Sequence, residues 1–295
     1  MKEHKLIVNS SDKTKLLLFL KAIFDKQYSV KELKKVIDHH GCRVNNQIEC
    51  VSTREVQKGD VVNFDPRVLP LRQPSFLPQV LCEDEFMTIY NKNAGFVCDD
   101  DEWRKSLDIK NLHLVNRLDK DTSGVVITAK NVKVKEEMIA LFRQHKIRKG
   151  YLCIVQKSLN EKAGKIDKSI YKKKSLDGKT IYTTQQTSFK GESALTFWRL
   201  IKKTDKASYL LCEPITGRTH QIRVHMSHLD APIWGDYLYG ARYDASFSCS
   251  RYLLHSYLLS FVNPFTHKNI EVKAPIPQDF LTAINALNLG KSLSN

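Results

Sequence analysis

The sequence predicts an α+β fold in which a small unit precedes a larger one. Strand-like apolar runs outnumber helical patterns, and few strand–helix–strand repeats of the kind that build a doubly wound sheet are visible. The stretch PRVLPLRQPSFLP holds four of the nine prolines, and proline suits an extended linker better than the interior of a helix or strand. We therefore expect a small unit at residues 1–65, a linker at 66–78 and a large unit at 79–295.

Two helices are expected in the small unit. The first follows Asp12 as its cap, and its apolar residues recur at helical spacing: Leu16, Leu20, Ile23 and Phe24. The second begins with the capping-box pattern at residues 29–32 and ends near Gly41. Its buried face consists of Leu33, Val36 and Ile37. After it, RVNNQIEC predicts a hairpin that turns at Asn45 and Asn46, and KGDVVNF predicts a turn into a last strand.

The remaining positions of the second predicted helix include three lysines. Lys31, Lys34 and Lys35 make this helix a candidate reader of backbone phosphates, although a solvated lysine face is a common alternative. The chain carries 47 Lys and Arg against 32 Asp and Glu, a net charge of +15. Such a charge raises the local concentration of a polyanion. Nucleic acid is therefore the natural candidate partner.

The composition indicates a soluble globular protein, with 42% hydrophobic and 27% charged residues. No apolar run reaches membrane-spanning length, and MKEHKLIVNSSDK lacks the apolar core of a signal peptide. We therefore expect a cytoplasmic protein with no membrane association. The seven cysteines are scattered and never spaced as Cys-x-x-Cys, which predicts reduced thiols rather than a zinc ribbon or a disulfide frame.

The large unit contains six strand-like runs, at residues 80–91, 113–119, 123–131, 151–156, 194–201 and 208–215. Asn131 is a candidate cap for one helix. The apolar face of that helix consists of Val134, Met138, Leu141 and Phe142. Residues 156–190 are polar, lysine-rich and weakly periodic, so loops and short exposed strands are expected there.

Two stretches of the large unit concentrate polar residues beside apolar strands. In NRLDKDTSG, residues 116–124, charged residues stand directly before a buried run, and a solvated turn is the simplest interpretation. The second stretch, EPITGRTHQIRVHMSHLDAPIWGDYLYG, brings His220, His225 and His228 close together in sequence. A metal-dependent hydrolase is an alternative on these histidines, but their spacing lacks the usual zinc pattern and no cysteine accompanies them. No glycine-rich phosphate loop supports a nucleotide cofactor.

These stretches resemble the motifs of one enzyme family. Residues 116–124 resemble the signature HRLDxxTSG of pseudouridine synthases of the RluA type, and residues 216–223, with the Gly-Asp and Tyr-Gly pairs that follow, resemble their second long motif. Residues 149–151 resemble the Lys-x-Tyr that supplies the active-site tyrosine. Further matches near the start and the end of the unit are Asn91-Lys92, Ala94-Gly95, Leu253-Leu254-His255 and Asn263-Pro264.

The matches stand in the family's order, from about residue 80 to 277, and three departures accompany them. Asn116 replaces the usual histidine, and Asn93 replaces the usual proline of the Lys-Pro-x-Gly turn. The segment between Gly95 and His113 also looks short. None of these departures removes the aspartate, tyrosine or arginine on which the family relies.

The resemblance implies an RNA pseudouridine synthase, an isomerase with a catalytic cleft across a central mixed, mostly antiparallel sheet and with neither cofactor nor metal. It assigns catalysis to Asp119, Tyr151 and Arg223, with Arg223 as the ion-pair partner of Asp119. The residues expected to bind substrate are Arg117, Lys149, Arg218 and His220, together with the helix lysines Lys31, Lys34 and Lys35. Residues 13–65 resemble the small RNA-binding domain named after a ribosomal protein of the small subunit.

Large-subunit ribosomal RNA is the expected substrate, and transfer RNA is the alternative because relatives serve both. A rival interpretation from another class is an RNA-binding or ribosome assembly protein that has lost catalysis. We expect the protein to act as a monomer.

Overall fold

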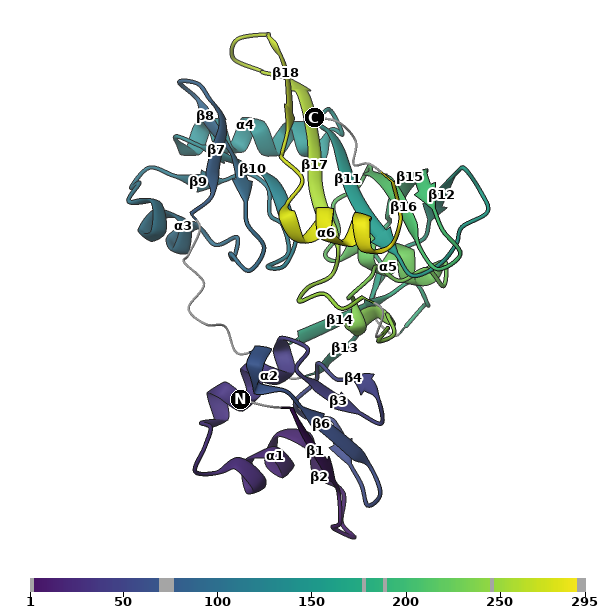
Figure 1. Ribbon diagram of the computed structural model, residues 1–295. Coiled ribbons are helices and arrows are strands. Elements are labelled where there is room, and N and C mark those ends of the chain that lie inside the picture. Colours follow the sequence, from purple (N-terminus) through teal and green to yellow (C-terminus); the bar gives the residue numbers. More distant parts are fainter. Residues whose placement is uncertain (1–2, 69–76, 177–178, 188–189, 245–246, 291–295) are drawn as a thin grey trace.

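The computed structural model describes residues 3–68, 77–176, 179–187, 190–244 and 247–290. The first of these segments forms a four-stranded sheet in the order β1-β6-β3-β4, a short β2-β5 pair and two helices (Figure 1). Their bounds are β1 His4–Ile7, β2 Thr14–Lys15, α1 Leu16–Phe24, α2 Val30–Asp38, β3 Cys42–Val44, β4 Gln47–Ile48, β5 Glu55–Val56 and β6 Val61–Phe64. One apolar cluster, drawn from both helices and the strands beneath them, forms the core of this unit.

The local sequence signals of this unit act as predicted, with one exception. The Ser29 hydroxyl accepts from the Glu32 amide and the Glu32 carboxylate accepts from the Ser29 amide, which completes the capping box of α2. Asn45 and Asn46 both have positive φ, 50° and 66°, as a tight hairpin turn requires. The predicted cap Asp12 was wrong, because β2 pairs with β5 and α1 begins only after that strand.

The linker begins with a short 3-10 helix, η1 Pro66–Val68. Val68 packs against the core of the small unit, so the first linker residues belong with that unit. Two of the linker prolines, Pro70 and Pro74, lie outside the described residues.

A ten-stranded sheet organises the rest of the chain. Its order is β12-β15-β16-β11-β17-β10-β8-β7, with β18 added to β17 and β9 added to β10. Neighbouring strands are antiparallel except for β10 and β17, which are parallel. The predicted mixed, mostly antiparallel sheet is therefore confirmed. The bounds are β7 Gln79–Glu83, β8 Met87–Lys92, β9 His113–Leu114, β10 Ser123–Ala129, β11 Arg148–Val155, β12 Ala163–Asp167, β15 Leu195–Lys203, β16 Ser208–Pro214, β17 Leu254–Val262 and β18 Asn269–Lys273.

Most of the predicted strands are present, but the run at 80–91 divides into two antiparallel strands, β7 and β8, and the run at 113–119 is not a strand throughout. Only β9, its first two residues, pairs with β10. The chain then leaves the sheet because the Asn116 side chain accepts the Ile127 amide (2.7 Å) and Leu118 packs into a separate apolar cluster. Residues 115–122 therefore form a loop. The polar segment 156–190 contains β12 and a small hairpin, β13 Tyr171–Leu176 with β14 Lys179–Thr183, in agreement with the prediction of short strands.

Helices cover the large sheet (Figure 1). Their bounds are α3 Asp100–Leu107, α4 Val132–Arg143, α5 Gln221–His228, the 3-10 helix η2 Tyr237–Tyr239 and α6 Gln278–Ala286. Asn131 caps α4 by accepting the Val134 amide, as predicted. The segment that looked short contains α3, which Asp99 caps. Helix α5 escaped prediction because six of its eight residues are buried and its polar side chains point inward. No helix in the described ranges is long and apolar enough to span a membrane.

Candidate active site

Asp119 lies in the loop between β9 and β10, and two buried cations bind the two backbone carbonyls that directly follow it. Lys92 of β8, fully buried, donates from Nζ to the Lys120 carbonyl (2.9 Å) and to two further carbonyls of residues 93–96. Burial lowers the pKa of Lys92 to about 8, so the side chain is largely charged at neutral pH. Arg251 donates from Nη1 to the Asp121 carbonyl (3.0 Å). The backbone that directly follows Asp119 is therefore held by two buried side chains.

The start of β10 needs glycine at one position. Gly124 has φ +112°, and a Cβ there would stand 2.0 Å from the Ser256 carbonyl oxygen. This close approach is where β10 meets β17 in parallel, over only two residue pairs. The loop that carries Asp119 consequently emerges beside the first residues of β17.

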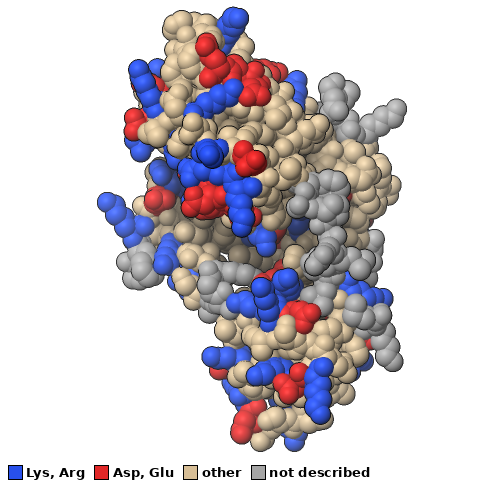
Figure 2. Space-filling view, turned by 90° about the vertical axis from the view of Figure 1, so that its left-hand side faces the viewer, with Lys and Arg blue, Asp and Glu red and all other residues tan. Residues whose placement is uncertain are grey.

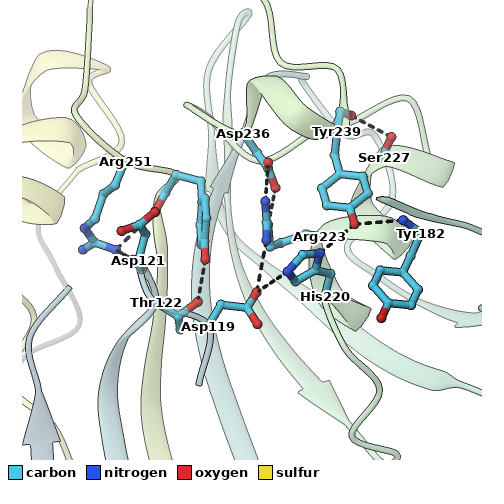
Figure 3. Close-up of polar contacts among 11 residues, drawn as sticks. Asp119, Asp121, Thr122, Tyr182, His220, Arg223, Ser227, Asp236, Tyr239 and Arg251 are labelled. Atoms are coloured by element: carbon cyan, nitrogen blue, oxygen red, sulfur yellow. Dashed lines mark hydrogen bonds and ion pairs between the residues drawn. The ribbon is translucent and has the colours of Figure 1, made fainter. Parts of the chain in front are cut away.

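Arg223 of α5 joins Asp119 to Asp236 (Figure 3). Its Nη1 donates to Asp119 Oδ2 (3.2 Å), while Nε and Nη2 donate to the two oxygens of Asp236 (2.7 and 2.9 Å). The Arg223 side chain is 6% exposed and that of Asp119 is 26% exposed. Burial opposes the charge of Arg223, but the carboxylate of Asp236 and the other groups around it raise the pKa well above its usual value. Arg223 is therefore a fixed cation beside a carboxylate that solvent reaches.

His220 stands at the N-cap of α5 with a left-handed backbone, φ 57°. Its Nε2 lies 3.7 Å from Asp119 Oδ2, and its Nδ1 shares a hydrogen bond with the Tyr239 hydroxyl (2.7 Å; Figure 3). Burial and the neighbouring Arg223 lower the pKa of His220. The ring is thus neutral at pH 7, and its contact with Asp119 is not an ion pair there.

Tyr151 of β11 packs between two apolar clusters of the large unit. It is opposite Cys212 on one side and Ser256 on the other, next to a register shift in its pairing with β17. Burial raises the pKa of Tyr151 to about 12, and Asp119 adds to this rise. The phenol of Tyr151 consequently stays protonated at neutral pH, and it interacts electrostatically with Asp119.

The remaining predicted substrate residues of the large unit do not contact Asp119. Arg117 is exposed. Lys149 donates from Nζ to the carbonyls of residues 215 and 216 (3.3 and 2.9 Å), and burial lowers its pKa to about 8. Arg218 donates to the Ser193 carbonyl (3.1 Å) and approaches Glu192. Lys149 and Arg218 hold the loop that leads to His220.

The helix lysines of the small unit lie on α2, with Lys31 and Lys35 exposed and Lys34 half-buried. The end of α2 is close to the large unit. His39 interacts electrostatically with Lys120 and Asp121. The rings of His40 and Tyr237 pack edge to face, with their centroids 4.8 Å apart. The lysine-bearing helix therefore ends beside the Asp119 loop.

Comparison with known proteins identifies the family of this site. The family model described as RNA pseudouridylate synthase matches residues 86–228. A Buchnera aphidicola protein named ribosomal large subunit pseudouridine synthase C is 30% identical over 95% of this chain and 96% of its own length. The chain belongs to the RNA pseudouridylate synthase family. It is accordingly an RNA pseudouridine synthase, an isomerase, and the family expected from the motifs is confirmed.

Other relatives of this synthase agree. A Pasteurella multocida protein named ribosomal large subunit pseudouridine synthase D is 28% identical over 88% of this chain and 87% of its own length. The solved structure titled human RNA pseudouridylate synthase domain containing 4 superimposes with a TM-score of 0.60, is 24% identical, and covers 72% of this chain and 94% of its own. That structural likeness shows that the two proteins share the pseudouridine synthase fold.

The histidines of α5 do not form a metal site in this synthase. His225 lies between the Thr196 hydroxyl and the Lys168 carbonyl (2.9 and 3.0 Å), and His228 shares a hydrogen bond with Thr184. His220 turns to Tyr239 instead. In the part of the synthase that the structure describes, no three His, Cys, Asp or Glu side chains are grouped as a metal would require.

Four buried residues of the site received no role from the sequence: Lys92, Asp236, Arg251 and Tyr252. Lys92 and Arg251 bind backbone carbonyls of the Asp119 loop, whereas Asp236 and Tyr252 contact the Arg223 side chain. The available signal was their position within the matched motifs or directly before them. A charged residue at the end of a buried strand, such as Lys92 in β8, is also unusual enough to indicate a buried polar contact.

Proposed function

We propose that this synthase isomerises uridines of large-subunit ribosomal RNA and that Asp119 is the reacting carboxylate. The observation that carries the proposal is the position of Asp119: accessible to solvent, on a loop held by buried cations, and paired with Arg223. Relatives whose names give a large ribosomal subunit substrate align over nearly the whole chain. Transfer RNA is the alternative outcome of the test below.

The chemistry requires that the bond from uracil N1 to the ribose breaks, that the base turns, and that C5 takes its place. Asp119 attacks the anomeric carbon as a nucleophile, or removes a sugar proton as a base in a route through a glycal. Both roles need the ionised carboxylate, and the adjacent cation Arg223 favours that form. The reaction involves no net change of oxidation state, so the residues need only transfer protons and hold the uracil that leaves the anomeric carbon until C5 bonds to it.

Tyr151 has a supporting role in this proposal. Its ring offers a surface on which the target base stacks, and its protonated hydroxyl can donate a hydrogen bond near the reacting atoms. The raised pKa of Tyr151 supports a donor rather than a base. Arg117, being exposed beside Asp119, contacts RNA or fills the space that an extruded nucleotide leaves.

Residues 1–65 form a separate RNA-binding domain in this proposal, joined by residues 66–78 to the catalytic domain at 79–295. Its own sheet and core support the division. Lys31, Lys34 and Lys35 contact backbone phosphates, and Lys149, Arg218 and His220 contribute to substrate binding in the catalytic domain. Figure 2 shows Lys and Arg side chains gathered where the two units meet. RNA is the partner, the protein acts as a monomer, and ribosomal RNA as substrate places it in the cytoplasm.

The test is a map of pseudouridines in RNA from cells with and without this protein. The expected result is the loss of one or more pseudouridines from large-subunit ribosomal RNA, which return when the wild-type protein is supplied and do not return with Asp119→Asn. Loss confined to transfer RNA would replace the proposed substrate. An unchanged map in every RNA would contradict the proposal.

A further inference from the structure

Asp236 occupies a tight turn between β11 and the Arg223 side chain. Its amide donates to the Ile233 carbonyl (2.9 Å), and its own carbonyl accepts the amides of Tyr239 and Ala241 (3.0 and 3.1 Å). Gly235 before it has φ +85°, and a Cβ there would lie 2.5 Å from the Arg251 carbonyl oxygen. Asp236 is 1% exposed. Its carboxylate therefore has one fixed position, away from solvent.

The Arg223 guanidinium is held in one orientation by its surroundings (Figure 3). Asp236 accepts from Nε and Nη2, so Nη1 is left for Asp119. The guanidinium carbon lies 4.1 Å from the ring centroid of Tyr252 and 4.8 Å from that of Tyr239. Planar arginine groups pair with carboxylates through two parallel bonds and stack on aromatic rings. Asp236 thus sets which N–H of Arg223 faces Asp119.

The single positive charge of Arg223 is shared between two carboxylates, Asp236 and Asp119. Arg223 carries one positive charge, and Asp236 and Asp119 carry one negative charge each. The shorter and more buried contact is with Asp236, at 2.7 Å against 3.2 Å for Asp119. Opposite charges at such distances interact strongly where water is excluded. Asp236 therefore offsets the charge of Arg223 more than Asp119 does, which weakens the attraction that would make Asp119 less basic and less nucleophilic.

We propose that Asp236 is a positioning residue for the isomerisation: it fixes the orientation of Arg223 and offsets its charge, so that Asp119 keeps its ion-pair partner and stays reactive. This inference rests on the proposed role of Asp119 as the reacting carboxylate. Its rival is that Asp236 only stabilises the fold, as buried partners of arginine commonly do. The two interpretations differ in what removal of the charge alone does to the reaction.

The decisive variant is Asp236→Asn in the full-length protein, assayed on an RNA transcript that the wild type modifies. The amide keeps the size of the side chain but neither its charge nor its second acceptor oxygen. We expect kcat to fall by about tenfold to a hundredfold, as small displacements of catalytic groups do, while the KM for RNA stays within about twofold. With Arg223 no longer offset, the acidic limb of the pH–rate profile should move to lower pH by about one unit.

Several titratable groups surround Asp119 and bear on this profile. Among the described residues, those whose pKa Asp119 influences include Lys92, Cys98, Tyr151, His220, Arg223, Tyr239 and Tyr252. The raised pKa values of the phenols and of the Cys98 thiol keep these groups neutral in acid, and Lys92 stays charged there. His220 does titrate in acid, so the comparison is repeated in a His220→Gln background, where the shift caused by Asp236→Asn should persist.

Asp279→Asn is the matched control. Asp279 pairs with the buried Arg251 through two bonds (2.6 and 3.1 Å), just as Asp236 pairs with Arg223. The other hydrogen bonds of Arg251 reach backbone carbonyls and the Ser123 hydroxyl rather than the Asp119 carboxylate. Removing the Asp279 charge can lower activity by loosening the loop, yet the acidic limb should stay in place. Asp236→Glu, which keeps the charge at an altered length, should lower kcat and likewise leave the limb unmoved.

The outcomes separate this inference from the function on which it rests. Pseudouridine formation by purified Asp119→Asn protein would remove the proposed function and this inference together. An inactive Asp119→Asn with a wild-type kcat and profile in Asp236→Asn would overturn only the inference. If Asp236→Asn does not fold, the Asp236→Glu variant provides the test: a wild-type kcat in that variant would also overturn the positioning role of Asp236.

Discussion

Asp119→Asn is the substitution that tests the catalytic assignment most directly. The side chain keeps its size, and the amide oxygen can still accept from Arg223 Nη1. Arg223 also retains both bonds to Asp236, so no buried charge is left without a partner. Because the substitution removes a single 3.2 Å ion pair of a side chain that is 26% exposed, the free energy of unfolding should change by only about 0.5 kcal/mol.

The effect on catalysis should be of a different order. An amide has neither the negative charge to attack the anomeric carbon nor the basicity to remove a sugar proton. Loss of a nucleophile can lower turnover by on the order of 10⁴-fold or more. We therefore expect a folded Asp119→Asn protein that binds RNA with wild-type affinity and makes no detectable pseudouridine.

The assay follows from the reaction itself. Formation of the new bond at C5 releases the hydrogen of that carbon, so RNA labelled with tritium at C5 of uridine releases tritium to water only when isomerisation completes. Asp121→Asn is the control: Arg251 binds the Asp121 backbone carbonyl rather than its side chain, so this variant should keep most activity. Tritium release above background by Asp119→Asn, purified free of host enzyme, would refute the reasoning.

Three other changes probe separate parts of the molecule. Tyr151→Phe should remain folded and lose most of its turnover, since it deletes one hydroxyl and keeps the ring; full activity would return Tyr151 to a packing role. The double variant Lys31→Ala, Lys35→Ala should weaken RNA binding. The slope of log affinity against log salt concentration should become shallower by about one unit for each phosphate that the protein no longer binds. An unchanged slope in a filter-binding titration would argue against α2 as an RNA contact. Burial lowers the pKa of His255 to about 4, so below about pH 6.5 the unfolded state takes up the proton before the folded state does. The free energy of unfolding should therefore fall by up to about 1.4 kcal/mol per pH unit between pH 6.5 and 4. Urea titrations at pH 7 and 4.5 measure this fall, and the same fall in a His255→Asn protein would show that another group causes it.

Local signals in the sequence predicted the small unit well because they act over a few residues. The capping box at Ser29 and the two left-handed asparagines of the hairpin carry their own structural requirement. The start of α1 was missed because a long-range pair, β2 with β5, decides it. Helix α5 was missed for a related reason: its polar residues face the protein interior, so it lacks the one-sided apolar pattern by which a surface helix is recognised.

The motifs predicted the pairing of Asp119 with Arg223, but the surroundings of this pair could not be predicted from the sequence. Lys92 and Arg251 act through backbone carbonyls, and any residue type supplies a carbonyl. A contact between a side chain and a backbone carbonyl therefore restricts the residue type of the side-chain partner only. Asp236 differs, because its partner is a side chain 13 residues away. The sequence shows Gly235 beside Asp236, but the reason for this glycine, the nearby Arg251 carbonyl, is evident only from the structure.

The sheet explains why such distant residues meet at Asp119. The parallel contact between β10 and β17 lasts two residue pairs, and β18 takes over the edge of β17 further along. The two strands therefore diverge from a common point, and the segments just before them, residues 119–122 and 251–253, lie side by side there. Arg251 precedes one strand and binds the loop that precedes the other, and Tyr252 meets Arg223 from the same place. A substitution at Gly124, where a Cβ would clash with the Ser256 carbonyl, should therefore disturb the site more than one at Gly59, whose φ is similarly positive but which has open space around it.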